Sequence, residues 1–328
     1  MKILLDCFGG DNAPDEVIKG ARAACDEFGS QIILVGDKSA VAEASQRLSV
    51  SLKGMDVAHA SGIFDMDEDP RDIVKGKPNS SMAVGLNMLA AGEGDAFISA
   101  GSTGGLVMGA SLLVGRIEGA KRPALAVAIP HPQGCYLLLD AGANLECRPE
   151  HLRQFAVMGS AYQEKVFSVR NPRVCLVNVG KEENKGTPIV REAFEMLKEI
   201  KNINFCGNVE ARELPVGGCD VAVADGFTGN MILKLSEGLA GMLFKEVKKI
   251  FLATSRTKIA AALVTKQFRD MAGRFDYSEY GGTPLLGIAK PVIKAHGSSR
   301  ADAFKNAIKK AELYAGTGVI EDIASKII

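Results

Sequence analysis

Short apolar segments alternate with longer stretches of helical periodicity along this chain. Seven apolar runs have the length of strands, and they occupy residues 2–5, 31–35, 96–99, 124–129, 135–139, 174–178 and 220–224. Strand-length runs separated by helix-length segments indicate a largely parallel sheet with helices on both faces, because parallel strands need long crossover connections. The chain contains no internal repeat and no obvious linker. The sequence therefore predicts a single three-layer α/β/α domain over residues 1–328.

Residues 235–275 depart from this alternation. They predict two consecutive helices that meet near Thr254 and Ser255, each with an apolar stripe at helical spacing. The stripes comprise Leu239, Leu243, Val247 and Ile250 in the first helix, and Ala260, Val264, Phe268, Met271 and Phe275 in the second. We expect a helical hairpin that protrudes from the α/β/α body.

The predicted hairpin is basic although the whole chain is neutral, with 39 basic and 39 acidic residues. Overall neutrality argues against a nucleic-acid-binding field. The residues expected to contact a carrier protein or a membrane are Lys245, Lys248, Lys249, Arg256, Lys258, Leu263, Lys266 and Arg269. A basic surface with an apolar tip suits an acidic protein partner or an anionic membrane. The alternative is a solvated face on a hairpin that forms a dimer.

Composition places the protein in the reducing cytoplasm. The 328 residues include seven cysteines without a C-x-x-C pair and four histidines without metal-ligand spacing, which argues against a disulfide framework and a zinc site. The first apolar run is too short for a signal peptide, and no run approaches the ~18 apolar residues of a membrane span. We expect a cytoplasmic protein with no metal.

Glycine-rich polar turns follow several of the predicted strands. Backbone N–H groups at a helix start bind anions, and ligands of parallel sheets bind beyond the carboxyl ends of strands. The candidate phosphate- or substrate-binding residues are Gly9, Gly10, Asp11, Ser99, Gly101, Ser102, Thr103, Gly104, Asn144, Asp225, Gly229, Ser298 and Ser299. The same residue types cap helices, so a capping role stays open for Asp11 and the two C-terminal serines.

Three further residues are candidates for catalysis. The turn 225–230 carries Asn230 into a helix expected to begin near Met231, and Lys185 lies beside Gly186 in a polar loop where a cation can neutralise phosphate or an oxyanion. His296 can act as an acid or base, or it can be structural. The G-x-G-x-x-G dinucleotide fingerprint, the P-loop and the G-x-S-x-G nucleophile elbow are all absent.

Nine segments together resemble the bacterial fatty acyl-ACP:phosphate acyltransferases, where ACP is acyl carrier protein. The resemblance covers nearly the whole chain and rests on residues 6–14, 66–71 with Lys77, Ser80 and Ser81, 99–104, 122–125, 140–144, 178–186, 225–230 with Lys234, 279–287, and 296–299. One position departs from the family pattern, because Ser102 stands where the family usually has Asn. A hydroxyl can still donate to phosphate, so activity is expected to survive.

The resemblance implies transfer of a long-chain acyl group from acyl-ACP to inorganic phosphate, giving acyl phosphate for phospholipid synthesis. It also implies a fold like that of isocitrate and isopropylmalate dehydrogenases, a homodimer, and no cofactor. The remaining expected partners are a membrane surface and the membrane acyltransferase that consumes acyl phosphate. Lys185 and Asn230 match two family motifs and are assigned to phosphate placement and oxyanion stabilisation, and His296 to protonation of the leaving thiolate.

Three rival functions remain open on the sequence alone. A phosphotransacetylase-like enzyme would perform the same chemistry on acyl-CoA. A dehydrogenase would use the same general fold, although the dinucleotide fingerprint is missing. A non-catalytic membrane scaffold would use the basic hairpin and would leave the glycine-rich turns unexplained.

Overall fold

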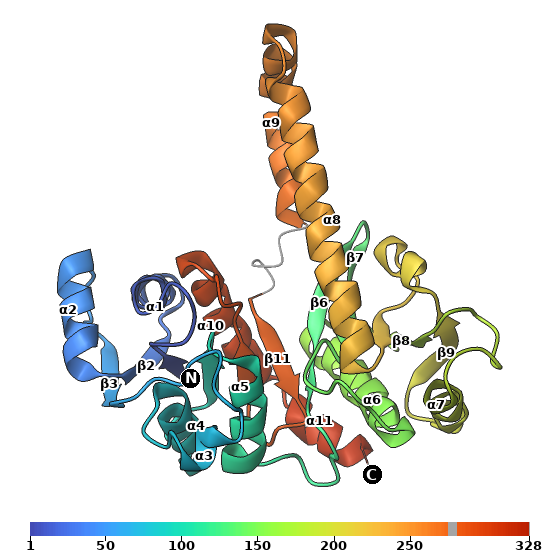
Figure 1. Ribbon diagram of the computed structural model, residues 1–328, viewed down its shortest axis with the longest axis horizontal. Coiled ribbons are helices and arrows are strands. Elements are labelled where there is room, and N and C mark those ends of the chain that lie inside the picture. The colour runs from blue at the N-terminus through green and yellow to red at the C-terminus, as the bar shows by residue number, and fades with distance from the viewer. Residues whose placement is uncertain (275–280, 328) are drawn as a thin grey trace.

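A computed structural model describes residues 1–274 and 281–327, without the side chains of residues 269, 270, 272 and 274. Its strands form two sheets (Figure 1). The first has the order β3 (Met55–His59), β2 (Gln31–Gly36), β1 (Lys2–Asp6), β4 (Ala96–Ser99), β12 (Val292–Lys294), β11 (Thr283–Leu286) and β5 (Ala124–Leu125). The second has the order β6 (Val127–His131), β7 (Gly134–Leu139), β10 (Val221–Val223), β8 (Arg173–Val177) and β9 (Asn204–Val209).

The sheets are largely parallel. Antiparallel pairing occurs between β11 and β12, between β11 and β5, and between β6 and β7. The other described neighbours run parallel, as between β1 and β4 and between β10 and β8. The predicted α/β fold with a mostly parallel arrangement of strands is confirmed.

The two sheets adjoin at Ala126. The predicted single strand over residues 124–129 is wrong, because Ala126 separates β5 of the first sheet from β6 of the second. The Ala126 N–H donates to the Pro284 carbonyl of β11 at 3.0 Å, and the Ala141 N–H after β7 donates to the Leu125 carbonyl at 3.0 Å. These bonds hold the edges of the sheets together.

Helices cover both faces of the joined sheets. In β1, Ile3 and Leu5 pack into one apolar cluster and Leu4 into the other, and each cluster draws residues from both sheets. Helices on the first face are α1 (Asp15–Phe28), α2 (Lys38–Leu48), α6 (Pro149–Val166), α7 (Pro188–Lys198), α10 (Ala301–Gly316) and α11 (Val319–Lys326). The second face carries α3 (Asp72–Lys75), α4 (Ser81–Ala91), α5 (Thr103–Gly109), the π-helical turn η1 (Ala110–Val114), the 3₁₀ helix η2 (Ala211–Val216) and the start of α8 (Gly226–Leu252).

Helices α8 and α9 (Ser255–Arg274) form a hairpin that projects from the body (Figure 1). The break at Thr254 agrees with the prediction, whereas Phe275, the predicted end, lies outside the described residues. The predicted start near Met231 is wrong. Helix α8 begins at Gly226, because the Asp225 carboxylate accepts a hydrogen bond from the Thr228 N–H at 2.7 Å and caps the helix there.

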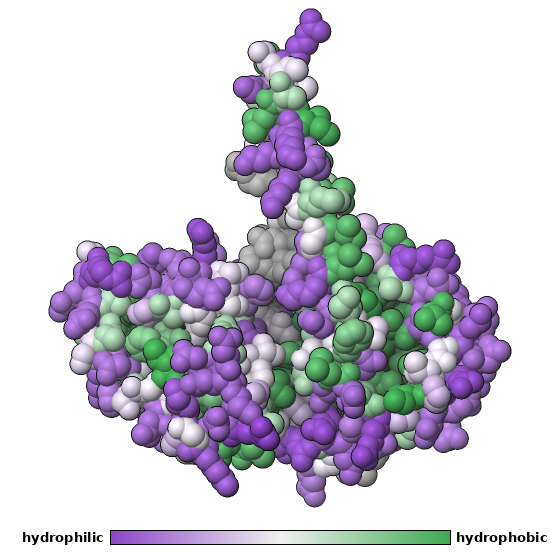
Figure 2. All heavy atoms as spheres, viewed as in Figure 1, coloured by the Kyte–Doolittle hydropathy of each residue, from purple (hydrophilic) through white to green (hydrophobic). Residues whose placement is uncertain are grey.

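The two helices of the hairpin pack through aromatic rings. Phe268 of α9 meets Phe244 and Phe251 of α8 edge-on, with ring centroids 5.8 and 5.5 Å apart. The predicted stripe of α8 faces away from this contact at several positions, and Leu239 and Leu243 are 47% and 59% exposed. Apolar side chains are therefore visible on the outside of the projection (Figure 2). Within the described part of the chain, no helix is both long and apolar enough to cross a membrane.

Candidate functional site

A cavity with a volume of about 770 Å³ lies where the two sheets adjoin. The turn after β4, the turn after β7, the loop after β12 and the first turns of α8 all contribute residues to its wall. These segments follow the carboxyl ends of strands in both sheets, which is where parallel α/β folds bind ligands. The predicted candidates that line the cavity are Gly101, Thr103, Asn230, His296, Ser298 and Ser299.

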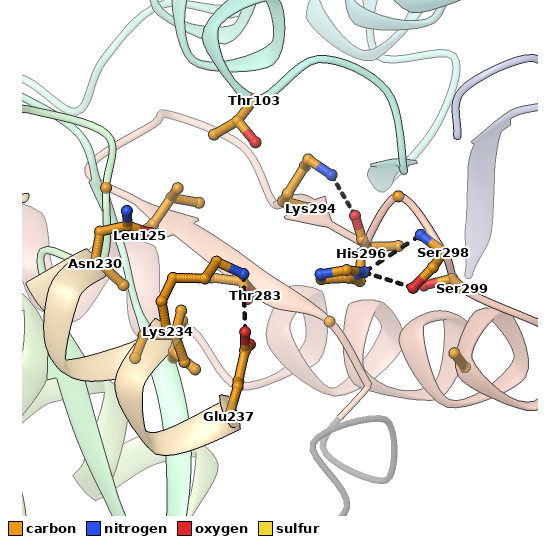
Figure 3. Close-up of a pocket in the computed structure, with 18 of the residues that line it drawn as sticks. Thr103, Leu125, Asn230, Lys234, Glu237, Thr283, Lys294, His296, Ser298 and Ser299 are labelled. Carbon is orange, nitrogen blue, oxygen red and sulfur yellow. Dashed lines mark hydrogen bonds and ion pairs between the residues drawn. The ribbon is translucent and has the colours of Figure 1, made fainter. Parts of the chain in front are cut away.

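The cavity has a mixed side, called the apolar side because it carries apolar surface beside Asn230, Lys234 and Glu237, and a polar side. Leu125, Val127 and Leu233 supply apolar surface. Figure 3 shows Leu125 and Asn230 on one side, and Lys294, His296 and Ser298 on the other. A molecule with an apolar tail and an anionic or polar head fits this arrangement.

The wall formed by residues 99–101 rests on a buried carboxylate. The Ser99 hydroxyl donates to Asp6 at 2.6 Å and accepts from the Gly101 N–H at 3.0 Å. Ser99 is fully buried, so its hydroxyl supports the turn and does not line the cavity. Burial raises the pKa of Asp6, and its hydrogen bonds partly oppose that shift.

The glycines of the first loop allow this wall to pack closely. A Cβ atom on Gly9 would lie 2.6 Å from both the Asp6 carboxylate and the Gly101 nitrogen, and one on Gly10 would lie 2.9 Å from the Gly297 carbonyl. The Asp11 N–H donates to the same Gly297 carbonyl at 2.8 Å. Gly9, Gly10 and Asp11 therefore stand behind the cavity wall.

A second buried carboxylate, Asp140, organises the turn after β7. It accepts hydrogen bonds from the backbone N–H groups of Leu125 and Ala143, each at 3.0 Å, and from that of Asn144 at 2.6 Å. The Asn144 side chain donates to Asp140 at 2.8 Å and to the Pro123 carbonyl at 2.7 Å. Asn144 is thus committed to holding this turn and is not part of the cavity lining.

Helix α8 starts directly against this turn. The Gly226 N–H donates to the Asn144 carbonyl at 2.8 Å, and a side chain at Gly229 would collide with the Asp140 carbonyl. Asp225 caps the helix, and neither it nor Gly229 lines the cavity. The packing that excludes them places Asn230, one residue further on, at the cavity surface.

His296 has a defined tautomer when its ring is neutral. The Ser298 N–H donates to Nδ1 at 3.3 Å, and the Ser298 hydroxyl lies 2.8 Å from the same nitrogen. Because a backbone N–H can only donate, Nδ1 accepts and the proton of a neutral ring sits on Nε2. The exposed His296 can therefore offer an Nε2–H donor to a ligand in the cavity.

Lys185 stands apart from the cavity lining. It is exposed in the loop after β8, and its carbonyl accepts from the Asn178 side chain at 3.1 Å. The structure does not bring Lys185 together with Asn230 and His296, although β8 neighbours the strand that leads into α8. Its assigned role stays a prediction.

Sequence reasoning overlooked Lys294, the last residue of β12. Its ammonium donates to the Ala100 carbonyl at 3.2 Å and to the Ala295 carbonyl, and its side chain lines the cavity. Burial lowers the pKa of Lys294 to about 8, while the charges of Asp6 and Asp11 oppose the shift. The sequence signal for Lys294 is weak, because only two apolar residues, Val292 and Ile293, precede it in a strand of three residues.

The chain matches known proteins along nearly its full length. A model of the family described as "Fatty acid synthesis protein" matches residues 1–322. A phosphate acyltransferase of Caldanaerobacter subterraneus subsp. tengcongensis is 46% identical over 328 residues, which are 100% of this chain and 97% of that protein.

Solved structures at lower identity establish the relation in fold. A phosphotransacetylase from Streptococcus pyogenes has a TM-score of 0.66 at 20% identity, covering 96% of this chain and 94% of its own. A putative 4-hydroxythreonine-4-phosphate dehydrogenase from Salmonella typhimurium has a TM-score of 0.53 at 11% identity, covering 95% of this chain and 99% of its own.

Ser102 should act as a helix cap. Its hydroxyl accepts from the Gly105 N–H at 3.3 Å at the start of α5. We expect Ser102→Ala to lower the free energy of unfolding by about 0.5–2 kcal/mol, and Ser102→Asn to change it little, because Asn caps as well as Ser. Urea unfolding of both variants measures this. If Ser102→Ala instead weakens phosphate affinity with unchanged stability, the hydroxyl is a ligand and the capping role is wrong.

Proposed function

The chain belongs to the fatty acid synthesis protein family and is a phosphate acyltransferase of phospholipid synthesis, and from that premise we propose that its acyl donor is long-chain acyl-ACP. The observation that carries the proposal is the two-sided cavity. Its apolar side, with Leu125 and Leu233, suits a fatty acyl chain, and its polar side suits phosphate.

The proposed reaction needs positioning more than deprotonation. A phosphate oxygen, already anionic, attacks the thioester carbonyl and forms the new C–O bond. The tetrahedral intermediate then collapses, the C–S bond breaks, and the carrier thiolate leaves with the electron pair. An unperturbed thiol has a pKa of ~8.5, so the thiolate is a fair leaving group and can take its proton from solvent. The reaction as proposed uses no metal and no organic cofactor.

We assign three residues to this chemistry. Asn230 reaches the cavity from the second turn of α8, and its carboxamide can donate to phosphate or to the developing oxyanion. His296 can donate from Nε2 on the opposite side of the cavity. Lys185 is assigned to the same anionic centre by its family motif and would have to move toward the cavity to act there.

The donor can be tested directly. Purified protein is given palmitoyl-ACP or palmitoyl-CoA, with and without inorganic phosphate, and thiol release is followed. We expect phosphate-dependent release from palmitoyl-ACP, because the proposed enzyme recognises the carrier. Equal release from CoA would favour the phosphotransacetylase-like alternative. Release from neither donor would contradict the proposal and favour the scaffold or dehydrogenase.

Truncation of the assigned residues should slow turnover. We expect Asn230→Ala and Lys185→Ala each to lower kcat by about a hundredfold or more, the usual effect of losing one oxyanion contact. Asn202→Ala and Lys201→Ala are matched controls, since both residues are exposed and lie outside the cavity. Near-normal turnover by both site variants would remove the assignment.

We further propose that the hairpin makes the protein a peripheral membrane protein and a homodimer. Leu263 and Ile259 near its tip are 77% and 67% exposed, and the exposed Lys258 and Lys266 flank them. Exposed apolar side chains beside cations suit an anionic membrane, and the same cations suit an acidic carrier protein. Of the predicted contact residues, Lys249 is paired with Glu246 at 2.6 Å. The Arg269 side chain lies outside the described residues.

The role of the tip can be tested by introducing a negative charge there. We expect Leu263→Glu to reduce binding to vesicles of mixed anionic and neutral lipids, because a carboxylate would replace apolar surface and repel the lipid headgroups. Leu112→Glu, which alters an exposed leucine on the body, is the matched control. Flotation measures binding, and sedimentation measures assembly. If Leu263→Glu preserves both, the tip serves neither purpose.

A further inference from the structure

A mostly buried lysine lines the polar side of the cavity. Lys294 follows the buried strand residues Val292 and Ile293, and its side chain extends past Ala100. Figure 3 shows its amine between Thr103 and His296. Among the residues that the structure describes, no carboxylate forms an ion pair with it.

The hydrogen bonds of this ammonium leave room for a ligand. Lysine carries three N–H donors. The described contacts use two of them, on the carbonyls of Ala100 and Ala295. Two carbonyl dipoles compensate only in part for a partly buried charge, and the carboxylates of Asp6 and Asp11 act on it without forming an ion pair. A ligand anion in the cavity would supply both the third acceptor and the opposite charge.

The other cations around the cavity differ from Lys294. Arg300 lines the cavity but is exposed. Lys234 is exposed and already paired with Glu237 at 2.9 Å. Lys185 lies outside the cavity lining. Lys310 of α10 is buried and donates to the Gly282 carbonyl at 3.0 Å, but it does not line the cavity. Lys294 therefore combines partial burial, charge and contact with the cavity.

Resting on the proposed function, we propose that Lys294 binds the attacking inorganic phosphate. The Thr103 hydroxyl lines the same cavity and lies toward Lys294 (Figure 3), so the anion would meet a further donor there. Phosphate held on this side faces the apolar side, where the acyl chain would lie. The thioester carbonyl would then sit between them, near Asn230.

Phosphate affinity should depend on the protonation of this lysine. The charged or titratable groups that face it are Asp6 of β1, Asp11 of the next loop, Lys234 of α8 and His296. Burial lowers the pKa of Lys294 to about 8 in the unliganded protein. Below that pH the amine is cationic and binds phosphate, and above it the amine becomes neutral. Affinity should therefore fall as pH rises through about 8, and bound phosphate should raise the pKa of the amine.

The test compares Lys294→Met with Lys310→Met in the full chain. Binding of inorganic phosphate is measured by calorimetry without acyl donor, and KM for phosphate and for the acyl donor are measured separately. We expect Lys294→Met to weaken phosphate binding by about 10- to 100-fold, as for loss of a charge-assisted hydrogen bond, with KM for the acyl donor changed much less. Lys310→Met controls for loss of a buried lysine and should bind phosphate normally.

Lys294→Arg provides a second test that keeps the charge. We expect it to bind phosphate better than Lys294→Met and to lose the decline above pH 8, because arginine stays protonated. Normal phosphate binding by folded Lys294→Met would overturn the role of Lys294. The proposed function would still stand if the wild type transfers acyl groups to phosphate. If Lys294→Met does not fold, a wild-type phosphate affinity that stays constant between pH 7 and 9.5 overturns it. A wild type that neither binds phosphate nor releases thiol would overturn the proposed function as well.

Discussion

Two buried carboxylates fix the shape of the cavity. Asp6 and Asp140 end or directly follow strands β1 and β7, and each is at most 1% exposed. A carboxylate in such a place must recover hydrogen bonds lost from water. It does so by gathering N–H and O–H donors from the turns around it, which leaves those turns few alternative conformations. The turn at Ser99 and the turn ending at Asn144 are held in this way, and helix α8 starts against the second.

This constraint separates residues that support the site from those that face it. A polar residue in a glycine-rich turn can hydrogen-bond to a buried group or point into the cavity. A shift of one residue along the chain decides which of the two it does. Asp225 caps α8, Gly229 lies too close to the Asp140 carbonyl to carry a side chain, and Asn230 emerges into the cavity. Composition and spacing do not encode that choice. It depends on which donor meets which acceptor after packing.

The layers of the fold, in contrast, can be predicted from the sequence. Apolar runs such as 135–139 must be buried, and their spacing dictates crossovers and hence parallel pairing. The sequence does not locate short strands such as β12, because three residues carry too little pattern. Lys294 was overlooked with that strand, since a lysine after an unrecognised strand reads as a surface group. Likewise, the run 124–129 gives no sign that Ala126 divides it between two sheets.

The way Lys294 is buried bears on how the enzyme would select phosphate over water. A solvent-exposed lysine must shed its hydration when it binds an anion, which cancels much of the Coulomb attraction. Lys294 is partly buried and loses part of that hydration during folding, so part of the cost falls on folding and not on the binding step. The anion then meets a cation that needs little reorganisation, in surroundings of low dielectric, where the attraction is stronger. The same burial places its pKa near 8, so the ammonium is only moderately favoured at neutral pH until phosphate arrives. A site of this kind gains affinity from the ligand's negative charge, and a neutral water molecule gains none of it.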